Sequence, residues 1–167
     1  ADLYCISLES FEEIASVKDF APEDESVQSV RFDGNSAYVC TAIHRQNQII
    51  DPVFFFDLSD LDNISYKETE AIDGMSTSLV DFGNGYLIGI GRLLDDYGNP
   101  LILKIEVYKE NENGVISVCK YVLSDVVSPT EYKEYYIDRE NQLLGFGYIT
   151  SSYDESKEID FMYALLK

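Results

Sequence analysis

Short apolar segments that stop abruptly in acidic turns recur along this chain. In DPVFFFDLSDLDNIS, residues 51–65, the apolar run Val53–Phe56 leads directly into a turn rich in Asp and Asn. Such segments start at Asp2, Pro52, Leu101 and Ile159, so successive copies lie 50, 49 and 58 residues apart. Self-similarity at this spacing is typical of proteins that stack repeated structural units.

A second apolar motif keeps step with the first. It reads SAYVCTAI from Ser36, GYLIGIGR from Gly85 and LLGFGYIT from Leu143, at intervals of 49 and 58 residues. A further β-prone segment precedes each copy of this motif, and a more polar segment follows the copies of the first motif that start at 2, 52 and 101. The repeating unit is therefore predicted to be four antiparallel strands in about fifty residues.

Turn residues and apolar runs support the same unit. Gly34-Asn35, Gly83-Asn84-Gly85 and Glu140-Asn141 separate the first two strands of three copies, and Gly and Asn supply the positive φ that tight hairpins require. Inner strands such as Val53–Phe56 lack polar alternation, which predicts burial on both faces. The fourth strand is more polar, with Lys67 in one copy, as expected of an exposed edge.

These features predict an all-β fold: a partial β-propeller of about three four-stranded antiparallel blades in one domain, residues 1–167. Two complete blades are expected at about 27–72 and 76–124, between incomplete blades at about 1–21 and 131–167. Closed propellers have about 4 to 8 blades, so we expect a piece of a larger ring, or a homodimer that completes the ring. A β-sandwich with Greek-key connections is the competing all-β interpretation.

Charge and apolar content narrow the class of partner. The 167 residues include 31 Asp and Glu against 12 Lys and Arg, a formal net charge of −19. Nucleic acids and anionic membranes are bound through cationic patches, so neither is an expected partner. No apolar stretch approaches the roughly 20 residues of a membrane-spanning helix, and the first residues do not read as a signal segment.

Cys5, Cys40 and Cys119 are expected to be small buried residues, with one disulfide between two of them as the alternative.

Acidic side chains gather in the turn that follows Val53–Phe56. Asp57, Asp60, Asp62 and Asn63 could offer oxygen ligands to calcium. Their spacing is not that of an EF-hand loop, and Asp and Asn also cap turns by accepting hydrogen bonds from backbone N–H groups. We therefore expect turn capping and no cofactor, with calcium as the alternative.

Few other residues suggest chemistry. His44 is the only histidine, is expected in a loop, and has no neighbouring nucleophile with which to form a triad. Gly89 and Gly91 lack the third glycine of a dinucleotide fingerprint and are expected to allow close packing near the propeller axis. Arg92 is a rare cation that could face the channel, in an ion pair or against an anionic ligand.

Two main hypotheses about function follow. The favoured one is a non-catalytic extracellular module that binds a protein or glycan through its loops, with Arg92, Tyr97 and Tyr153 as ligand-binding candidates. The alternative is a hydrolase or metal-dependent enzyme in which acids from several blades converge at the axis. A purely structural spacer in a longer surface protein is a third interpretation.

Four segments together have a distinctive order and spacing: SVRFDGNSAYVCT (29–41), DPVFFFDLSDLDN (51–63), YLIGIGR (86–92) and IDRENQLLGF (137–146). In this order and spacing they resemble a known family, the bacterial and archaeal secreted proteins with a C-terminal β-propeller domain. The family usually has proline where this chain has Leu61 and Ile64, and it tends to have Asp-His-Lys where this chain has Glu131-Tyr132-Lys133. The resemblance implies a secreted or cell-surface propeller and no particular reaction.

Overall fold

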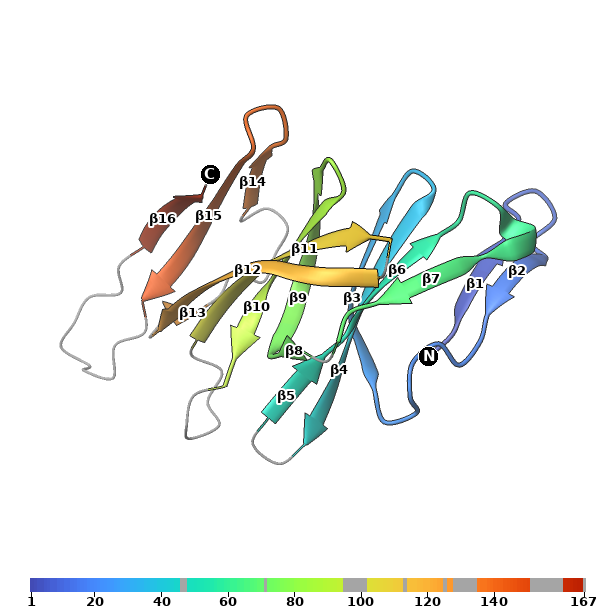
Figure 1. The fold of residues 1–167 in the computed structure, drawn as a ribbon, viewed down its shortest axis with the longest axis horizontal. Coiled ribbons are helices and arrows are strands. Elements are labelled where there is room, and N and C mark those ends of the chain that lie inside the picture. The colour runs from blue at the N-terminus through green and yellow to red at the C-terminus, as the bar shows by residue number, and fades with distance from the viewer. Residues whose placement is uncertain are drawn as a thin grey trace.

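The computed structural model groups the strands of this chain into four antiparallel sheets that stand side by side (Figure 1). It describes residues 1–45, 48–70, 72–94, 102–112, 114–124, 126–127, 135–150 and 161–166. Its elements are β1 (Leu3–Ile6), β2 (Glu13–Val17), β3 (Ser26–Asp33), β4 (Ser36–Arg45), β5 (Gln48–Asp51), β6 (Val53–Asp57), the 3₁₀ turn η1 (Leu61–Asn63), β7 (Ser65–Glu68), β8 (Ile72–Asp73), β9 (Met75–Gly83), β10 (Tyr86–Leu93), β11 (Ile102–Asn111), β12 (Gly114–Ser124), β13 (Val126–Val127), β14 (Tyr135–Asp138), β15 (Leu143–Thr150) and β16 (Phe161–Leu166).

The sheets follow the predicted repeat. β1 and β2 form the first sheet, and the third is a four-stranded sheet in the order β9-β10-β11-β12. In the second sheet the long strand β4 pairs with β3 on one edge and with β6 on the other, and β6 pairs with β7. The fourth sheet has β15 between β14 and β16. The prediction of an all-β fold, a partial β-propeller built from antiparallel sheets, is therefore confirmed.

Three short strands were not predicted. β5 extends the second sheet by pairing with the far end of β4, β8 pairs with β5, and β13 pairs with β15. His44, expected in a loop, instead pairs with Ile49 in the β4–β5 ladder. Strands of two to four residues between polar segments carry too little apolar pattern to be recognised from sequence.

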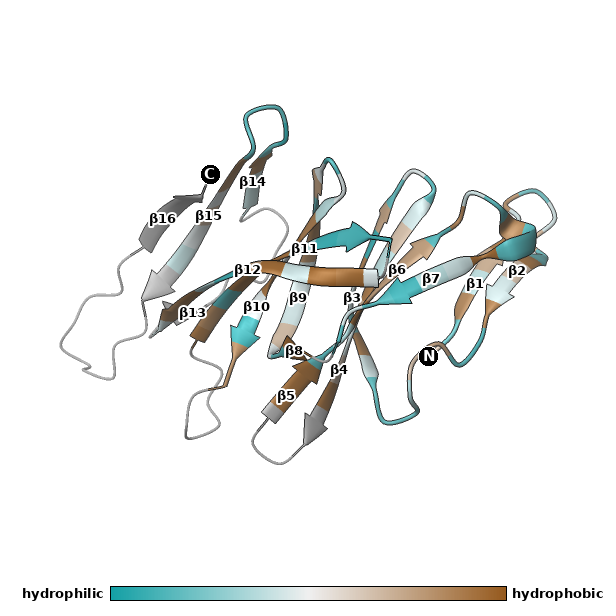
Figure 2. Cartoon of the chain, in the orientation of Figure 1, coloured by the Kyte–Doolittle hydropathy of each residue, from teal (hydrophilic) through white to brown (hydrophobic). Residues whose placement is uncertain are grey.

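The apolar run in β6 is buried because it lies between two neighbouring sheets. Phe54 and Phe56 point to one side, where they pack with Phe20, Ala37 and Val39 against the first sheet. Val53 and Phe55 point to the other side, into a cluster shared with the third sheet. A strand buried on both faces loses polar alternation, as predicted, and Figure 2 shows apolar residues along these strands with hydrophilic residues at the hairpin ends.

Gly89 and Gly91 in β10 allow close packing of neighbouring strands. A Cβ at Gly91 would lie 1.7 Å from the carbonyl oxygen of Met75 in β9, and one at Gly89 would lie 2.6 Å from the Ser76 hydroxyl. The predicted hairpin turns are present at Gly34 and at Asn84, with φ of 54° and 55°. In the third turn the positive φ belongs to Gln142 instead of the expected Glu140-Asn141.

The three cysteines differ in their surroundings. Cys40 is buried, Cys5 is half-buried and Cys119 is exposed, and all three are free thiols. The expectation of burial is therefore wrong for Cys119, because β12 is an outer strand with few neighbours.

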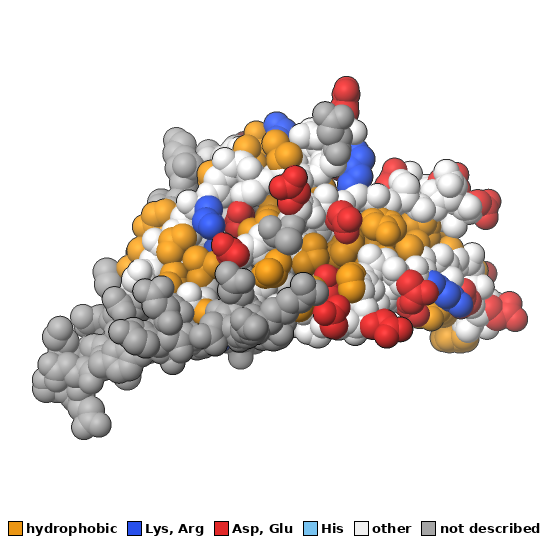
Figure 3. Space-filling model, turned by 60° about the horizontal axis from the view of Figure 1, so that its bottom comes forward, with side chains coloured by type: hydrophobic (Ala, Val, Ile, Leu, Met, Phe, Trp, Pro, Cys, Tyr) orange, Lys and Arg blue, Asp and Glu red, His pale blue; other side chains and the backbone are white. Residues whose placement is uncertain are grey.

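No helix among the described residues is long and apolar enough to cross a membrane. On the face in Figure 3, acidic side chains are scattered around a band of apolar ones.

Candidate functional site

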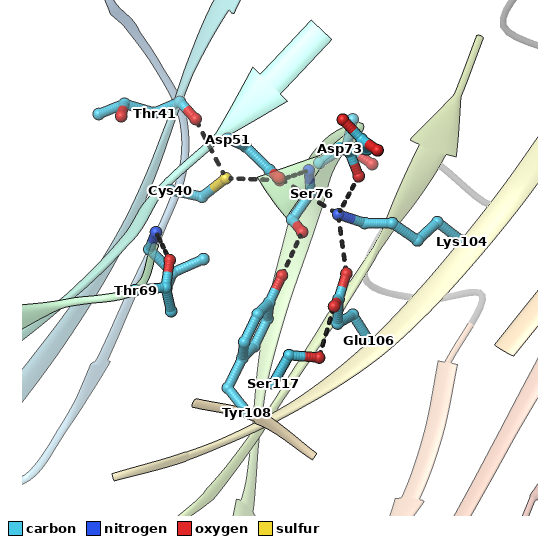
Figure 4. A network of polar contacts seen from close by, with 12 residues as sticks. Cys40, Thr41, Asp51, Thr69, Asp73, Ser76, Lys104, Glu106, Tyr108 and Ser117 are labelled. Atoms are coloured by element: carbon cyan, nitrogen blue, oxygen red, sulfur yellow. Dashed lines mark hydrogen bonds and ion pairs between the residues drawn. The ribbon is translucent and has the colours of Figure 1, made fainter. Parts of the chain in front are cut away.

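A network of buried polar side chains joins the second and third sheets (Figure 4). Its centre is Lys104, which lies in the middle of the apolar strand β11 and whose side chain is 0% exposed. Alternation along β11 turns Lys104, Glu106 and Tyr108 to the same face of the sheet. All three are buried there, and Lys104 reaches Asp51 of β5 and Asp73 of β8 in the second sheet.

The ammonium group of Lys104 is held by both sheets. Its Nζ donates to Asp51 Oδ1 at 3.2 Å and to the backbone carbonyl of Asp73 at 3.1 Å. It also lies 3.2 Å from Glu106 Oε2, an ion pair without hydrogen-bond geometry. Glu106 Oε1 accepts a hydrogen bond from Ser117 in β12. One buried cation is thus shared by two buried carboxylates, which lowers the cost of removing all three charges from water.

Asp51 links this ion cluster to Cys40 and β9. Its Oδ2 accepts hydrogen bonds from the Ser76 N–H at 2.7 Å and from the Cys40 thiol at 3.3 Å. Burial raises the pKa of Asp51, and the neighbouring Lys104 opposes that rise. Burial, reinforced by the Asp51 charge, raises the pKa of the Cys40 thiol well above its ordinary value. Cys40 is therefore held as a neutral thiol, and thiols react as nucleophiles only when ionised.

The network holds the two sheets together and offers no reactive group to a substrate. Asp51 and Lys104 are fully buried, so a substrate has no access to them. Burial also raises the pKa of Tyr108, whose hydroxyl lies 3.4 Å from Ser76 Oγ, so this phenol stays protonated. The sequence signal for the network was the pair of charges inside LILKIEVYK; its partner Asp51 could not be assigned because β5 was not predicted.

A second feature is a groove where the first strands of three sheets run side by side. We call it the axial groove, because such strands surround the channel of a propeller. It has a volume of about 400 Å³. β3, β9 and β14 line it through Ser29, Val30, Arg31, Thr77, Ser78, Leu79, Val80, Tyr135 and Ile137.

Hydroxyl groups tie the strands of the axial groove together. Ser29 Oγ donates to the Ser76 carbonyl at 2.9 Å, across the second and third sheets. The Tyr135 hydroxyl donates to Ser78 Oγ at 3.4 Å, across the third and fourth sheets. Among the described residues that line the groove, none is Asp, Glu or His. The lining therefore offers hydroxyls, apolar side chains and the guanidinium of Arg31, but no general base.

The predicted calcium ligands lie together in the turn around η1. Asp57 Oδ1 accepts from the Ser59 N–H at 2.9 Å, and Asp60 Oδ1 accepts from the Asp62 N–H at 3.1 Å. The Asn63 N–H donates to the Asp60 carbonyl at 3.1 Å. In the part of the chain that the structure describes, no three His, Cys, Asp or Glu side chains are grouped to hold a metal ion. Calcium binding here stays a prediction.

Of the three predicted ligand-binding residues, Arg92 lies in the part of the chain that the structure describes. Arg92 lies half-buried near the end of β10, and its buried Nε has no hydrogen-bond partner among the described residues. Its role in an ion pair or with a ligand stays a prediction. Tyr97 and Tyr153 lie outside the described residues.

Comparison with protein families identifies a propeller domain in this chain. A family model for a beta propeller domain matches residues 1–163. An uncharacterised protein of Archaeoglobus fulgidus is 28% identical over 134 residues, which cover 80% of this chain and 17% of that protein. An uncharacterised protein of Methanocaldococcus jannaschii is 34% identical over 113 residues, which cover 67% of this chain and 16% of that protein. The chain thus spans less than a fifth of either relative. No solved structure matches it significantly.

Proposed function

The chain belongs to the beta propeller domain family, and from that membership we propose that it is a non-catalytic module that binds a protein or glycan in its axial groove. The observation that carries this proposal is the composition of the groove. Three sheets contribute hydroxyls and apolar side chains to one concave surface, and concave surfaces with a few convergent polar groups are the usual form of a binding site.

The chemistry of the lining suits a polar ligand with apolar faces. Ser29, Thr77, Ser78 and Tyr135 carry hydroxyls that both donate and accept hydrogen bonds, which matches the hydroxyls of a sugar or the amides of a peptide. Val30 and Ile137 are 47% and 38% exposed and offer apolar contact beside them. Arg31 would attract an anionic group, which favours acidic glycans or acidic peptides over neutral ones.

We propose an extracellular location, as for the secreted proteins that the sequence resembles. Tyr97 and Tyr153 remain ligand-binding candidates, and a homodimer or a longer chain would complete the ring. Protection of the domain from protease added to intact cells would contradict the extracellular location.

A binding screen with a groove-filling variant tests the proposal. The 167-residue domain is immobilised and exposed to arrays of glycans and of peptides, including acidic members of both. For any ligand found, Ser78→Leu is expected to weaken binding at least tenfold, because the larger side chain occupies the groove. Ser65→Leu, at an exposed position of β7, is the matched control and should bind as the unmodified domain does.

Two outcomes would overturn the proposal. Equal binding by Ser78→Leu and the unmodified domain would place the ligand elsewhere. Cleavage of a bound ligand, followed as new reducing ends or new amino termini over time, would favour the hydrolase alternative. That alternative draws no support from the lining of the axial groove, which lacks carboxylates among its described residues.

A further inference from the structure

The outer strand of the third sheet differs from the other outer strands. β12 has 11 residues, whereas β2 has 5 and β7 has 4. Among the strands that the structure describes, it pairs with β11 alone. Seven successive residues, 116–122, are exposed, and Ile116, Val118, Tyr121 and Val122 among them are 40% to 48% exposed. A long, apolar, unpaired edge strand is a template for pairing with another strand.

β12 also differs from the chain as a whole in its lack of acidic residues. Gly114–Ser124 contains no Asp or Glu, and Lys120 is its only charged residue, although the chain as a whole carries 31 acids. β7 is protected by Lys67 and Glu68, as predicted for an outer strand, but β12 is not. Two copies of a chain with a net charge of −19 repel each other, and an edge without acids is where that repulsion is smallest.

We infer that β12 pairs with β12 of a second copy, antiparallel and around a two-fold axis at Cys119. Cys119 is the middle residue of Gly114–Ser124, so pairing along the whole strand places it opposite itself. Because Val118 is an additional residue on β12, the register shifts by one on each side of Cys119, so Ile116 of each copy faces Tyr121 of the other. Two exposed apolar residues thereby meet, which is the self-complementarity that a two-fold interface requires. This inference does not rest on the proposed function.

A β-bulge in β12 sets the register of this pairing. Along the β11–β12 ladder, Val107 pairs with Cys119 and Tyr108 with Ser117, so Val118 is the additional residue. Bulges increase local twist. The two-fold axis places one bulge on each side of Cys119. Ile116 pairs with Lys109 and Tyr121 with Ile105, so Ile116 and Tyr121 lie on the same face of the sheet, as residues that face each other across two strands must.

A disulfide between the exposed Cys119 thiols of two copies would show that the strands pair in this register. Directly opposite residues in an antiparallel pair have Cα atoms about 4.5 to 5.5 Å apart, within the range of about 4.4 to 6.8 Å that a disulfide spans. With oxidised glutathione as the oxidant, one Cys119 thiolate displaces a glutathione thiolate and forms a mixed disulfide. The Cys119 thiolate of the second copy then displaces the second glutathione thiolate, and the two chains are linked.

The test measures mass in solution by sedimentation over a dilution series. We expect the unmodified chain to form dimers at high concentration. Ile116→Lys is expected to weaken the dimer at least tenfold, because each new ammonium group faces Tyr121 of the partner. The double variant Ile116→Lys with Tyr121→Glu is expected to recover the dimer, because both facing pairs then carry opposite charges. Ile14→Lys, at an exposed position of β2, is the matched control and should leave the dimer intact.

Cross-linking gives a second, independent measurement. Oxidised glutathione is expected to produce a covalent dimer from the unmodified chain and from Cys5→Ser, but not from Cys119→Ser, on a non-reducing gel. A chain that stays monomeric at every concentration would overturn the inference. A dimer that Ile14→Lys breaks and Ile116→Lys spares would also overturn it, since the second copy would then complete the ring through the first sheet.

Discussion

At the scale of single residues, the unusual feature of this protein is the cost of burying Lys104. A buried ammonium group is tolerated only when its charge is compensated and its donors are used. Here Asp51 and Glu106 supply the charges, and the Asp73 carbonyl supplies a further acceptor. Lys104 lies in the third sheet, whereas Asp51 and Asp73 lie in the second. The interactions of this one lysine therefore determine how the two sheets align.

Removal of the Lys104 charge should strongly destabilise the fold. Lys104→Met keeps the apolar stem but leaves two buried carboxylates without a cation, and we expect a loss of about 3 to 5 kcal/mol in the free energy of unfolding. Urea unfolding followed by circular dichroism measures this loss. Adding Asp51→Asn to Lys104→Met should recover part of it, and a single variant as stable as the unmodified protein would show that the cluster contributes nothing.

The stability lost in Lys104→Met should become smaller as the pH falls. Burial already raises the pKa of Asp51 above its ordinary value of 3.8, and in Lys104→Met the opposing effect of the ammonium group is gone. A carboxyl group with a raised pKa in the folded state stabilises the fold at low pH, and that contribution is lost as the pH rises through the raised value. Lys104→Met should therefore approach the unmodified protein in stability as the pH falls toward 4.

At the scale of strands, the spacing between β9 and β10 depends on the absence of side chains. The backbone of β9 lies so close to Gly91 that a methyl group would overlap the Met75 carbonyl. At Gly34 the situation is reversed: nothing lies within 4 Å of a Cβ, but φ is 54°. Glycine is thus needed at position 91 because there is no room for a side chain, and at position 34 because the backbone is left-handed.

A pair of alanine substitutions separates these two demands. Gly91→Ala should cost about 3 kcal/mol or more, because backbone atoms of β9 must move to admit the methyl group. Gly34→Ala should cost about 1 kcal/mol, the conformational penalty of a left-handed residue without a clash. Thermal unfolding of both variants measures the difference, and equal losses would mean that the β9–β10 contact adapts at no cost.

Prediction from sequence succeeded where a pattern is repeated and failed where contacts are long-range. The inner strands were recognised because β6 and β10 carry apolar runs in phase with the repeat. The exposure of Cys119 was missed because an outer strand rich in Val and Ile reads like a buried one. The partnership of Asp51 with Lys104, 53 positions apart, depends on how two sheets stack, and no local pattern in either strand specifies it.

At the scale of the whole molecule, the acidic surface works against compactness. With a net charge of −19, surface carboxylates repel one another more in the folded state than in the expanded chain. We expect the melting temperature to rise by several degrees between low salt and about 0.5 M sodium chloride, because screening shortens the range of this repulsion. Differential scanning calorimetry measures the shift; a melting temperature that falls would mean that screened ion pairs outweigh the repulsion.

The position of the lysine cluster also constrains how such a ring can change during evolution. In a repeat protein each unit contacts only its neighbours, so a single unit could in principle be duplicated. A duplicated copy of Met75–Ser124 would carry Lys104 and Glu106 with it but leave Asp51 and Cys40 behind in the preceding sheet. The inherited cation would lose its main partner at the moment of duplication. This sheet is therefore tied to its predecessor, and the two would have to be copied together or the lysine replaced first.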